Sequence, residues 1–290
     1  MMKRQLIFGV GVLALAGMTI PAGAADMPVK APPIAPPVAF SWTGCYIGGY
    51  AGYADPQRST FTDLGNATFR AFSGGITAGR IENPHSWNVD LDTSFIGGGT
   101  IGCNWQAVGS PFVFGIEGEV GFMEVKGATF DPFLAPNVPV IAQRAAPDVL
   151  GAGRVGDWYA MITGRLGYAW DRTLFYVKGG AAFVPVRAAV VDSCPFTAAG
   201  CGNWAIATGA RDTITTWTIG GGIEWAFYEN WSLKGEYMFI GLDDNFTTCG
   251  TATLASGAVV PGGNFCFNHA FDGIHTAKIG LNYRFGSFWR

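Results

Sequence analysis

Charge is scarce in this sequence. Asp, Glu, Lys and Arg together make up 13% of its 290 residues, about half of the share that is usual in soluble proteins. After the first 24 residues the chain also lacks any run of 18 apolar residues, which excludes a transmembrane helix there. No basic stripe or patch is visible, and this argues against nucleic acid as a partner. Yet aromatic residues reach 14%, so the apolar side chains must be distributed along the chain rather than collected in one segment.

The first 24 residues have the three parts of a secretory signal peptide. Lys3 and Arg4 supply the basic segment, residues 5–20 are almost uncharged and apolar, and residues 22–24 are the small residues that signal peptidase reads. The apolar run is too short to span a bilayer comfortably and ends in a cleavage site, so a permanent anchor is the weaker interpretation. We expect cleavage after Ala24. The following segment, 25–41, is rich in proline, which favours an extended polyproline form and predicts a periplasmic linker.

From Thr43 onward, apolar residues recur with a period of two in segments of about 10 to 13 residues, the length that a tilted membrane strand needs. The eight expected strands are Thr43–Ala54, Phe95–Gln106, Phe112–Met123, Trp158–Trp170, Leu174–Val184, Thr213–Ala226, Trp231–Ile240 and His275–Phe285. Short turns alternate with long polar connections at 55–94, 124–157, 185–212 and 241–274, a pattern typical of outer-membrane barrels. The sequence therefore predicts an all-β fold over residues 42–290: an eight-stranded antiparallel up-and-down transmembrane β-barrel with four long extracellular loops.

The third expected strand shows the alternation clearly. Phe114, Ile116 and Phe122 share one face, whereas Glu117 and Glu119 share the other. A soluble β-sandwich would also alternate, but its exposed face would be crowded with Lys, Glu and Thr, and here the polar face is mostly glycine. Glycine suits the crowded lumen of a small barrel. Aromatic residues at the expected periplasmic strand ends predict a girdle at the membrane boundary: Trp42, Trp105, Phe112, Trp170, Phe175, Trp225, Trp231 and Phe285.

Three segments resemble a known family. Residues 41–53, SWTGCYIGGYAGY, and 95–106, FIGGGTIGCNWQ, resemble the first two strands of the alphaproteobacterial outer-membrane immunogenic proteins. The spacing of Lys278, Gly280, Tyr283 and Phe285 resembles the carboxy-terminal assembly signal of bacterial outer-membrane proteins. The resemblance implies an opacity-type surface antigen, related in architecture to the small OmpA-like barrels, with the barrel-assembly machinery as a partner.

The sequence departs from this family pattern in two places. Barrels of this kind usually stop at the terminal aromatic residue, whereas residues 286–290 follow Phe285 here, so Phe288 or Trp289 could share the signal role. Cys45 and Cys103 stand where aromatic residues are expected.

Strand alternation places nine charged side chains in the lumen: Glu117, Glu119, Arg165, Lys178, Glu224, Lys234, Glu236, Lys278 and Arg284. Because buried charges are tolerated only when they are paired, these four acids and five bases predict an interior salt-bridge network. A selectivity ring in a conducting pore is the alternative, but an eight-stranded barrel is just wide enough for its own side chains. Glu117 and Glu119 could suggest acid–base chemistry, yet neutralising bases surround them.

The six cysteines fit an oxidising compartment. Cys194 and Cys201 fall within one long connection, and Cys249 and Cys266 within another, so each pair predicts a disulfide that closes a local loop. Cys45 and Cys103 fall near the periplasmic ends of neighbouring strands on one expected face, and whether they pair depends on the register. A metal site is the rival interpretation, but no spacing resembles a paired C-x-x-C zinc site.

The three histidines carry no diagnostic motif. His85 and His269 lie in long connections, and His275 opens the last expected strand. Catalytic groupings can be drawn from His85 and Ser86 with Asp90 and Asp92, or from His269 with Asp243 and Asp244, but solvated loop residues are the favoured interpretation. Haem capture by a loop histidine stays a hypothesis.

We therefore expect neither an enzyme nor a cofactor. The favoured function is a structural, surface-interacting barrel in the outer-membrane lipid that presents its loops to an extracellular ligand or host surface. A narrow porin-like channel or a haem-capture protein is the alternative. A ring of unpaired like charge in the lumen would favour transport, and the near balance of acids and bases favours structure.

Overall fold

The computed structural model describes residues 40–65, 84–131, 149–194, 204–242, 245–254 and 256–285. The expected signal peptide and almost all of the Pro-rich segment lie outside these ranges. The described residues form thirteen strands in one antiparallel sheet. They are β1 (Gly44–Pro56), β2 (Ser59–Asp63), β3 (His85–Val89), β4 (Ser94–Gln106), β5 (Phe112–Phe130), β6 (Val149–Gly156), β7 (Tyr159–Trp170), β8 (Thr173–Cys194), β9 (Trp204–Tyr228), β10 (Trp231–Gly241), β11 (Asn245–Leu254), β12 (Val259–Phe271) and β13 (Gly273–Phe285). Within these ranges, no helix is long and apolar enough to cross a membrane.

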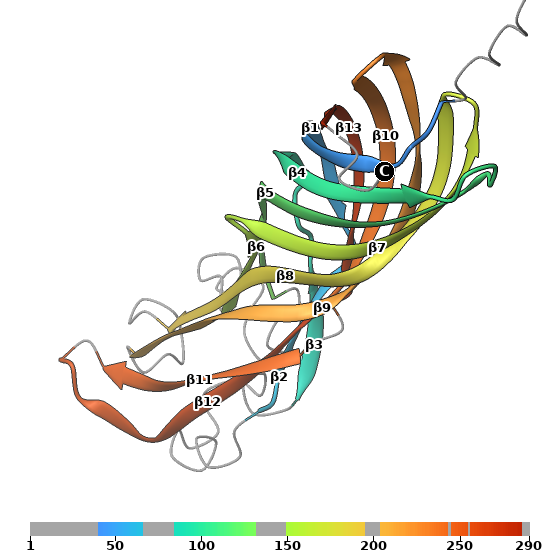
Figure 1. Ribbon diagram of the computed structural model, residues 1–290. Helices are drawn as coiled ribbons and strands as arrows, with labels where there is room; N and C mark the ends of the chain where they lie inside the picture. Colours follow the sequence, from blue (N-terminus) through green and yellow to red (C-terminus); the bar gives the residue numbers. More distant parts are fainter. Residues whose placement is uncertain are drawn as a thin grey trace, which may run out of the picture. The chain divides into compact units, whose positions relative to one another are not determined.

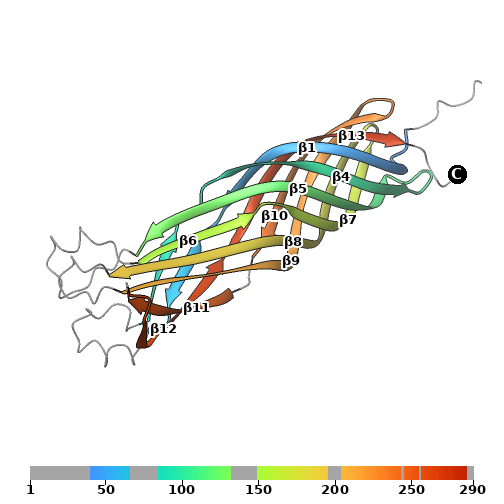
Figure 2. The same ribbon diagram turned by 90° about the vertical axis from the view of Figure 1, so that its left-hand side faces the viewer.

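Eight of the strands form a closed ring in the order β1-β4-β5-β7-β8-β9-β10-β13 (Figures 1 and 2). The ring closes where β13 pairs with β1, from Cys45 opposite Phe285 to Pro56 opposite Ile274. A lipid environment requires that a sheet have no open edge, and closure of the ring meets this requirement in the membrane-spanning part. All eight expected strands are present, and the predicted eight-stranded antiparallel barrel is confirmed.

The ring strands alternate between an apolar outer face and a lumen face. On β5, Ile116, Val120 and Phe122 each expose more than half of their surface, whereas Glu117 and Glu119 are buried. A continuous exposed apolar band around a closed ring is the surface that lipid covers. Seven of the eight aromatic residues expected in the periplasmic girdle are exposed on this face.

Trp42 is the exception, because its side chain is only 2% exposed. β1 begins at Gly44, whose φ of +145° suits glycine, so strand alternation does not set the direction of Trp42. The indole packs inside the periplasmic mouth of the ring against a cluster made of Val113, Leu174, Tyr176 and Ala226. The expectation that Trp42 belongs to the girdle was wrong.

The long connections are not simply polar loops. β5, β8 and β9 continue well past the ring, and β2, β3, β6, β11 and β12 lie wholly within the four segments expected as loops. These parts pair in the order β3-β2-β12-β11-β9-β8-β6-β5 and are called the outer extension here (Figures 1 and 2). Buried apolar side chains fill it, including Phe61, Trp87, Phe265 and Phe267. The predicted loop boundaries are therefore wrong for the described residues, because the two-residue alternation continues beyond the lipid-facing band.

Candidate functional site

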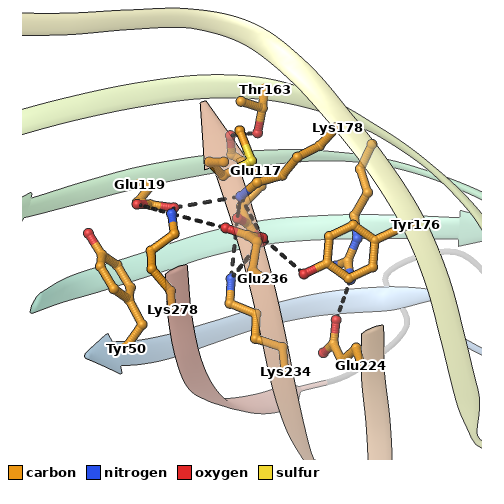
Figure 3. A network of polar contacts seen from close by, with 12 residues as sticks. Tyr50, Glu117, Glu119, Thr163, Tyr176, Lys178, Glu224, Lys234, Glu236 and Lys278 are labelled. Carbon is orange, nitrogen blue, oxygen red and sulfur yellow. Dashed lines mark hydrogen bonds and ion pairs between the residues drawn. The ribbon is translucent and has the colours of Figure 1, made fainter. Parts of the chain in front are cut away.

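The lumen of the ring holds eight of the nine expected charged residues in one network. Figure 3 shows this network from close by and labels its members except Arg165. They come from six strands, and none exposes more than 5% of its surface. The members are Glu117 and Glu119 on β5, Arg165 on β7, Lys178 on β8, Glu224 on β9, Lys234 and Glu236 on β10, and Lys278 on β13. We call this set the lumen network. Four acids face four bases, so its formal charge is zero.

Glu117 and Glu119 each bind two lysines. The Glu117 carboxylate accepts hydrogen bonds from Lys178 Nζ at 2.6 Å and from Lys234 Nζ at 3.2 Å. The Lys278 ammonium donates to both oxygens of Glu119, at 2.6 and 2.8 Å, and Lys178 Nζ lies 3.6 Å from the same carboxylate. Lys178 thus bridges Glu117 and Glu119, which lie two residues apart on the lumen face of β5.

Glu236 completes the centre of the network. Its Oε2 lies 2.9 Å from Lys178 Nζ and 4.0 Å from Lys234 Nζ, and its Oε1 lies 3.0 Å from Lys278 Nζ. One carboxylate therefore contacts all three lysines (Figure 3). Three glutamates and three lysines neutralise one another, which is the condition for burying charge at low cost.

Arg165 and Glu224 form a second pair. Arg165 Nη2 donates to Glu224 Oε2 at 2.5 Å, and the guanidinium stacks 3.6 Å from the centre of the Tyr176 ring. The other Glu224 oxygen accepts from Ser232 Oγ at 2.6 Å and from Asn282 Nδ2 at 2.9 Å. The carboxylate thus has a charged partner and two neutral donors, as a stable buried anion needs.

Arg284 was expected in the lumen network, but the structure places it elsewhere. Its side chain is half-buried at the periplasmic end of β13 and donates to the backbone carbonyls of Ser41, at 2.8 Å, and Glu229, at 3.1 Å. The guanidinium also lies over the Phe40 ring, 4.5 Å from its centre. The expectation was wrong because Arg284 lies one residue before the strand ends, where carbonyl groups and aromatic rings replace acids as partners.

Sequence reasoning missed four lumen tyrosines that connect to the network. Tyr46 donates to Glu117 at 2.5 Å, Tyr159 to Glu119 at 2.9 Å and Tyr176 to Glu236 at 2.9 Å. Tyr50 bonds to the Tyr159 hydroxyl at 2.8 Å. The same alternation that placed the acids inward also places these tyrosines inward, so the signal was available.

Apolar side chains fill the ring on both sides of the lumen network. On the periplasmic side lies the cluster around Trp42. On the other side Ile96, Met123, Met161 and Ile240 form part of a larger core that reaches Phe271 in the outer extension. The three central glutamates place ligand oxygens within 4.8 Å of one another, a spacing that could hold a cation. The three lysines already occupy that position, so the arrangement is suited to internal neutralisation.

Disulfides join two of the three candidate cysteine pairs, one that the sequence predicted and one that it left open. Cys45 and Cys103 are directly opposite each other on β1 and β4, and Cys249 and Cys266 are opposite each other on β11 and β12. The sequence did not determine the register of these two strands, and the structure has the register in which Cys45 and Cys103 pair. The third expected pair, Cys194 with Cys201, lies outside the residues whose side chains are described.

The histidines have structural partners. His269 is fully buried between Phe61 and Phe246, and its Nε2 is 2.8 Å from the Thr248 hydroxyl. Burial lowers the pKa of His269 to about 4, so the ring is neutral at physiological pH. His85 Nε2 is 2.7 Å from Asp131 Oδ2 rather than close to Asp90 or Asp92, and Asp243 and Asp244 lie outside the described residues. The structure thus gives His85 a partner outside the grouping that could be drawn from the sequence, and the His269 grouping lies partly outside the described residues.

The four residues that resemble an assembly signal lie along β13. Lys278 belongs to the lumen network, and Gly280 leaves room for Lys234, because an added Cβ would lie 3.0 Å from its side chain. Tyr283 and Phe285 face outward, and Tyr283 packs edge-on against Trp231. β13 therefore presents polar residues to the lumen and aromatic residues to the lipid boundary.

The comparisons with known proteins agree with the fold. Residues 10–285 match the family described as outer membrane protein beta-barrel domain. The chain is 31% identical over 270 residues to the 31 kDa outer-membrane immunogenic proteins of Brucella melitensis and Brucella suis, an alignment covering 90% of this chain and 92% of each relative.

Solved structures of small barrels are similar as well. OprG from Pseudomonas aeruginosa aligns with a TM-score of 0.42 at 9% identity, over 84% of this chain and 97% of OprG. Ail from Yersinia pestis aligns with a TM-score of 0.31 at 11% identity, over 83% of this chain and 99% of Ail. The resemblance seen in the sequence is confirmed by the family match and by the Brucella relatives. The chain belongs to the outer membrane protein beta-barrel family and is an outer-membrane protein related to the immunogenic antigens of Brucella.

Proposed function

We propose that this protein is a closed structural barrel that carries a rigid surface extension, and that it neither conducts ions nor catalyses a reaction. The observation that supports this most strongly is the pairing of four buried acids with four buried bases across the lumen. A conducting pore needs a continuous path for water, and here packed side chains occupy the lumen on both sides of the network.

The outer extension is the part that would meet the surroundings of the cell. Its strands hold a buried core rich in aromatic residues, so the backbone that carries its outward side chains is held in a defined arrangement. A disulfide fastens β11 to β12 within it. A fixed surface of this kind suits a surface antigen, and the Brucella relatives are named as immunogenic. We include contact with a host surface or extracellular ligand in the proposed function.

Conductance distinguishes this proposal from the channel alternative. The folded wild-type protein should give no stable current in a planar lipid bilayer, because the lumen network and its apolar neighbours leave no water path. Replacing both Glu117 and Glu119 with alanine should produce brief openings, since Lys178, Lys234 and Lys278 then repel one another.

The matched control for this experiment is Glu124→Ala with Asp157→Ala, which removes two acids from the outer face instead of the lumen. This control variant should give no current across the bilayer. A steady, ion-selective current from the wild type, unchanged by the lumen substitutions, would overturn the closed-barrel proposal in favour of a channel.

We also propose that β13 is read by the barrel-assembly machinery. Phe285 faces the lipid boundary opposite Cys45, at the strand pair that closes the ring. Phe285→Ala should lower the fraction of heat-modifiable, folded protein recovered from outer membranes, and Tyr283→Ala should have a smaller effect. Normal folding of Phe285→Ala, combined with failure after deletion of Phe288 and Trp289, would place the signal at those later residues instead.

A further inference from the structure

Four cations form a transverse row on the outer face of the extension. Lys126 on β5 is directly opposite Arg154 on β6, Arg154 is opposite Arg187 on β8, and Arg187 is opposite Arg211 on β9. These strands are neighbours in the sheet (Figure 2). Their side chains point outward, because Val125, Val155 and Val186 beside them are fully buried. At roughly 4.8 Å per strand, the row spans about 14 Å.

The row lies just beyond the lipid-facing band. β5 runs outward from the periplasmic end, and Phe122, exposed on the same face as Lys126, is four residues before it. On the next connection Trp158 is exposed, four residues after Arg154. Aromatic residues at these positions mark the outer boundary of the hydrocarbon region. The row is therefore placed at the level of the lipid headgroups of the outer leaflet.

Acidic partners neutralise only part of the row. Like charges directly opposite each other on neighbouring strands are destabilising. The row contains three adjacent pairs of cations, and in two of these pairs both cations contact the same acid. Glu124 contacts Lys126 at 3.3 Å and Arg154 at 3.2 Å, and Asp157 binds both Arg154 and Arg187. Strand direction places both acids on the membrane side of the row. Arg211 forms no ion pair with any residue that the structure describes.

A hollow of about 780 Å³ borders the row on the side away from the membrane. Its floor is made of small residues that follow the same register, Ala128, Ala152, Ala189 and Gly209. Of the charged residues that line it, the four cations outnumber a single acid, Asp92. Small side chains leave space against the sheet, and the cations form one wall of that space.

We propose that this row and hollow bind the phosphorylated saccharide of the outer-leaflet glycolipid, lipopolysaccharide. Arginine guanidinium groups pair with phosphate through two parallel hydrogen bonds, and Arg187 and Arg211 are the adjacent pair with no acid between them among the described residues. The sugar rings would occupy the hollow over the small residues, while the acyl chains continue along the exposed apolar band below. A glycolipid anchored in the same leaflet reaches this site by lateral movement.

Binding to defined lipids tests the proposal. Purified full-length protein in detergent micelles is titrated with bisphosphorylated lipid A, and in parallel with lipid A from which both phosphates have been removed. The wild type should prefer the phosphorylated lipid by at least about tenfold, and Arg187→Gln with Arg211→Gln should abolish that preference. Arg58→Gln, an exposed cation of the extension outside the row, is the matched control and should bind as the wild type does.

Two further variants keep the test decisive. If the double variant fails to fold, as judged by heat modifiability, Arg211→Gln alone should still weaken binding, because Arg211 supports no ion pair whose loss would affect folding. Glu124→Gln should act in the opposite direction and tighten binding, since it releases Lys126 and removes one of the two acids that contact Arg154. Equal affinity for the two lipids, or unchanged affinity in the arginine variants, would overturn the proposal. Row-dependent binding of heparin without binding of lipid A would also overturn it and assign the row to a sulfated polysaccharide.

Discussion

Glu236→Ala is expected to lower the free energy of unfolding by about 3 to 5 kcal/mol, the usual effect of breaking a dry buried ion pair. Glu236 contacts Lys178, Lys234 and Lys278. Without it, three buried lysines share two acids, and Tyr176 loses its acceptor. Urea titration of the protein folded in lipid vesicles, followed by tryptophan fluorescence and gel mobility, measures the change.

Glu124 provides the matched control. It also contacts two basic residues, but its side chain is 33% exposed on the outer surface. Water screens that pair, so Glu124→Ala should cost at most about 1 kcal/mol. Equal small losses for the two variants would show that water reaches the lumen network and would contradict its description as dry.

Phe61→Ala is expected to destabilise the outer extension by about 3 to 5 kcal/mol, because it leaves a cavity in a fully buried aromatic core. Phe61 packs against Trp87 and edge-on against His269, 4.4 Å between ring centres. Hydrogen exchange should become faster in β2, β3 and β12, whereas the ring strands should stay protected, since their cores lie mainly in a different cluster.

Thr60→Ala is the control on the same strand, because the Thr60 side chain points away from the core. It should leave exchange in the extension unchanged. Loss of protection in the ring strands of Phe61→Ala, to the same degree as in β2, would show that the extension and the ring unfold as one unit.

Alternation along the strands predicted most of the lumen from the sequence. A period of two decides which side chains face inward, so Glu117, Glu119 and Lys278 could be placed before any contact was known. The same rule does not reach the strand ends, and for that reason Arg284 and Trp42 were placed wrongly. Trp42 lies before β1 begins, and Arg284 lies one residue before the end of β13, where rim carbonyls and aromatic rings are available as partners.

The outer extension could not be predicted from composition. Its segments are rich in Gly, Pro, Asp and Thr, which favours loops, and only the continued alternation of Phe265, Phe267 and Phe271 indicated strands. The register between neighbouring strands could not be predicted from the sequence either. The basic row shows this well, because Lys126 and Arg211 lie far apart in the sequence and form no visible basic patch there. Only the pairing of four strands brings them into line.

The lumen network leads us to expect that this barrel inserts into the membrane as one cooperative unit. Its contacts join residues far apart in the sequence, such as Glu119 with Lys278, 159 positions away, and Glu117 with Lys234, 117 positions away. A sheet that lacked β13 would leave Glu119 and Glu236 short of a cation and would have to expose them to hydrocarbon, which is strongly unfavourable. We therefore expect the unpaired charge of a partly assembled sheet to keep it out of the bilayer. On this view, the buried charges of the lumen are all paired only when β13 closes the ring, and only the closed ring is stable in the bilayer.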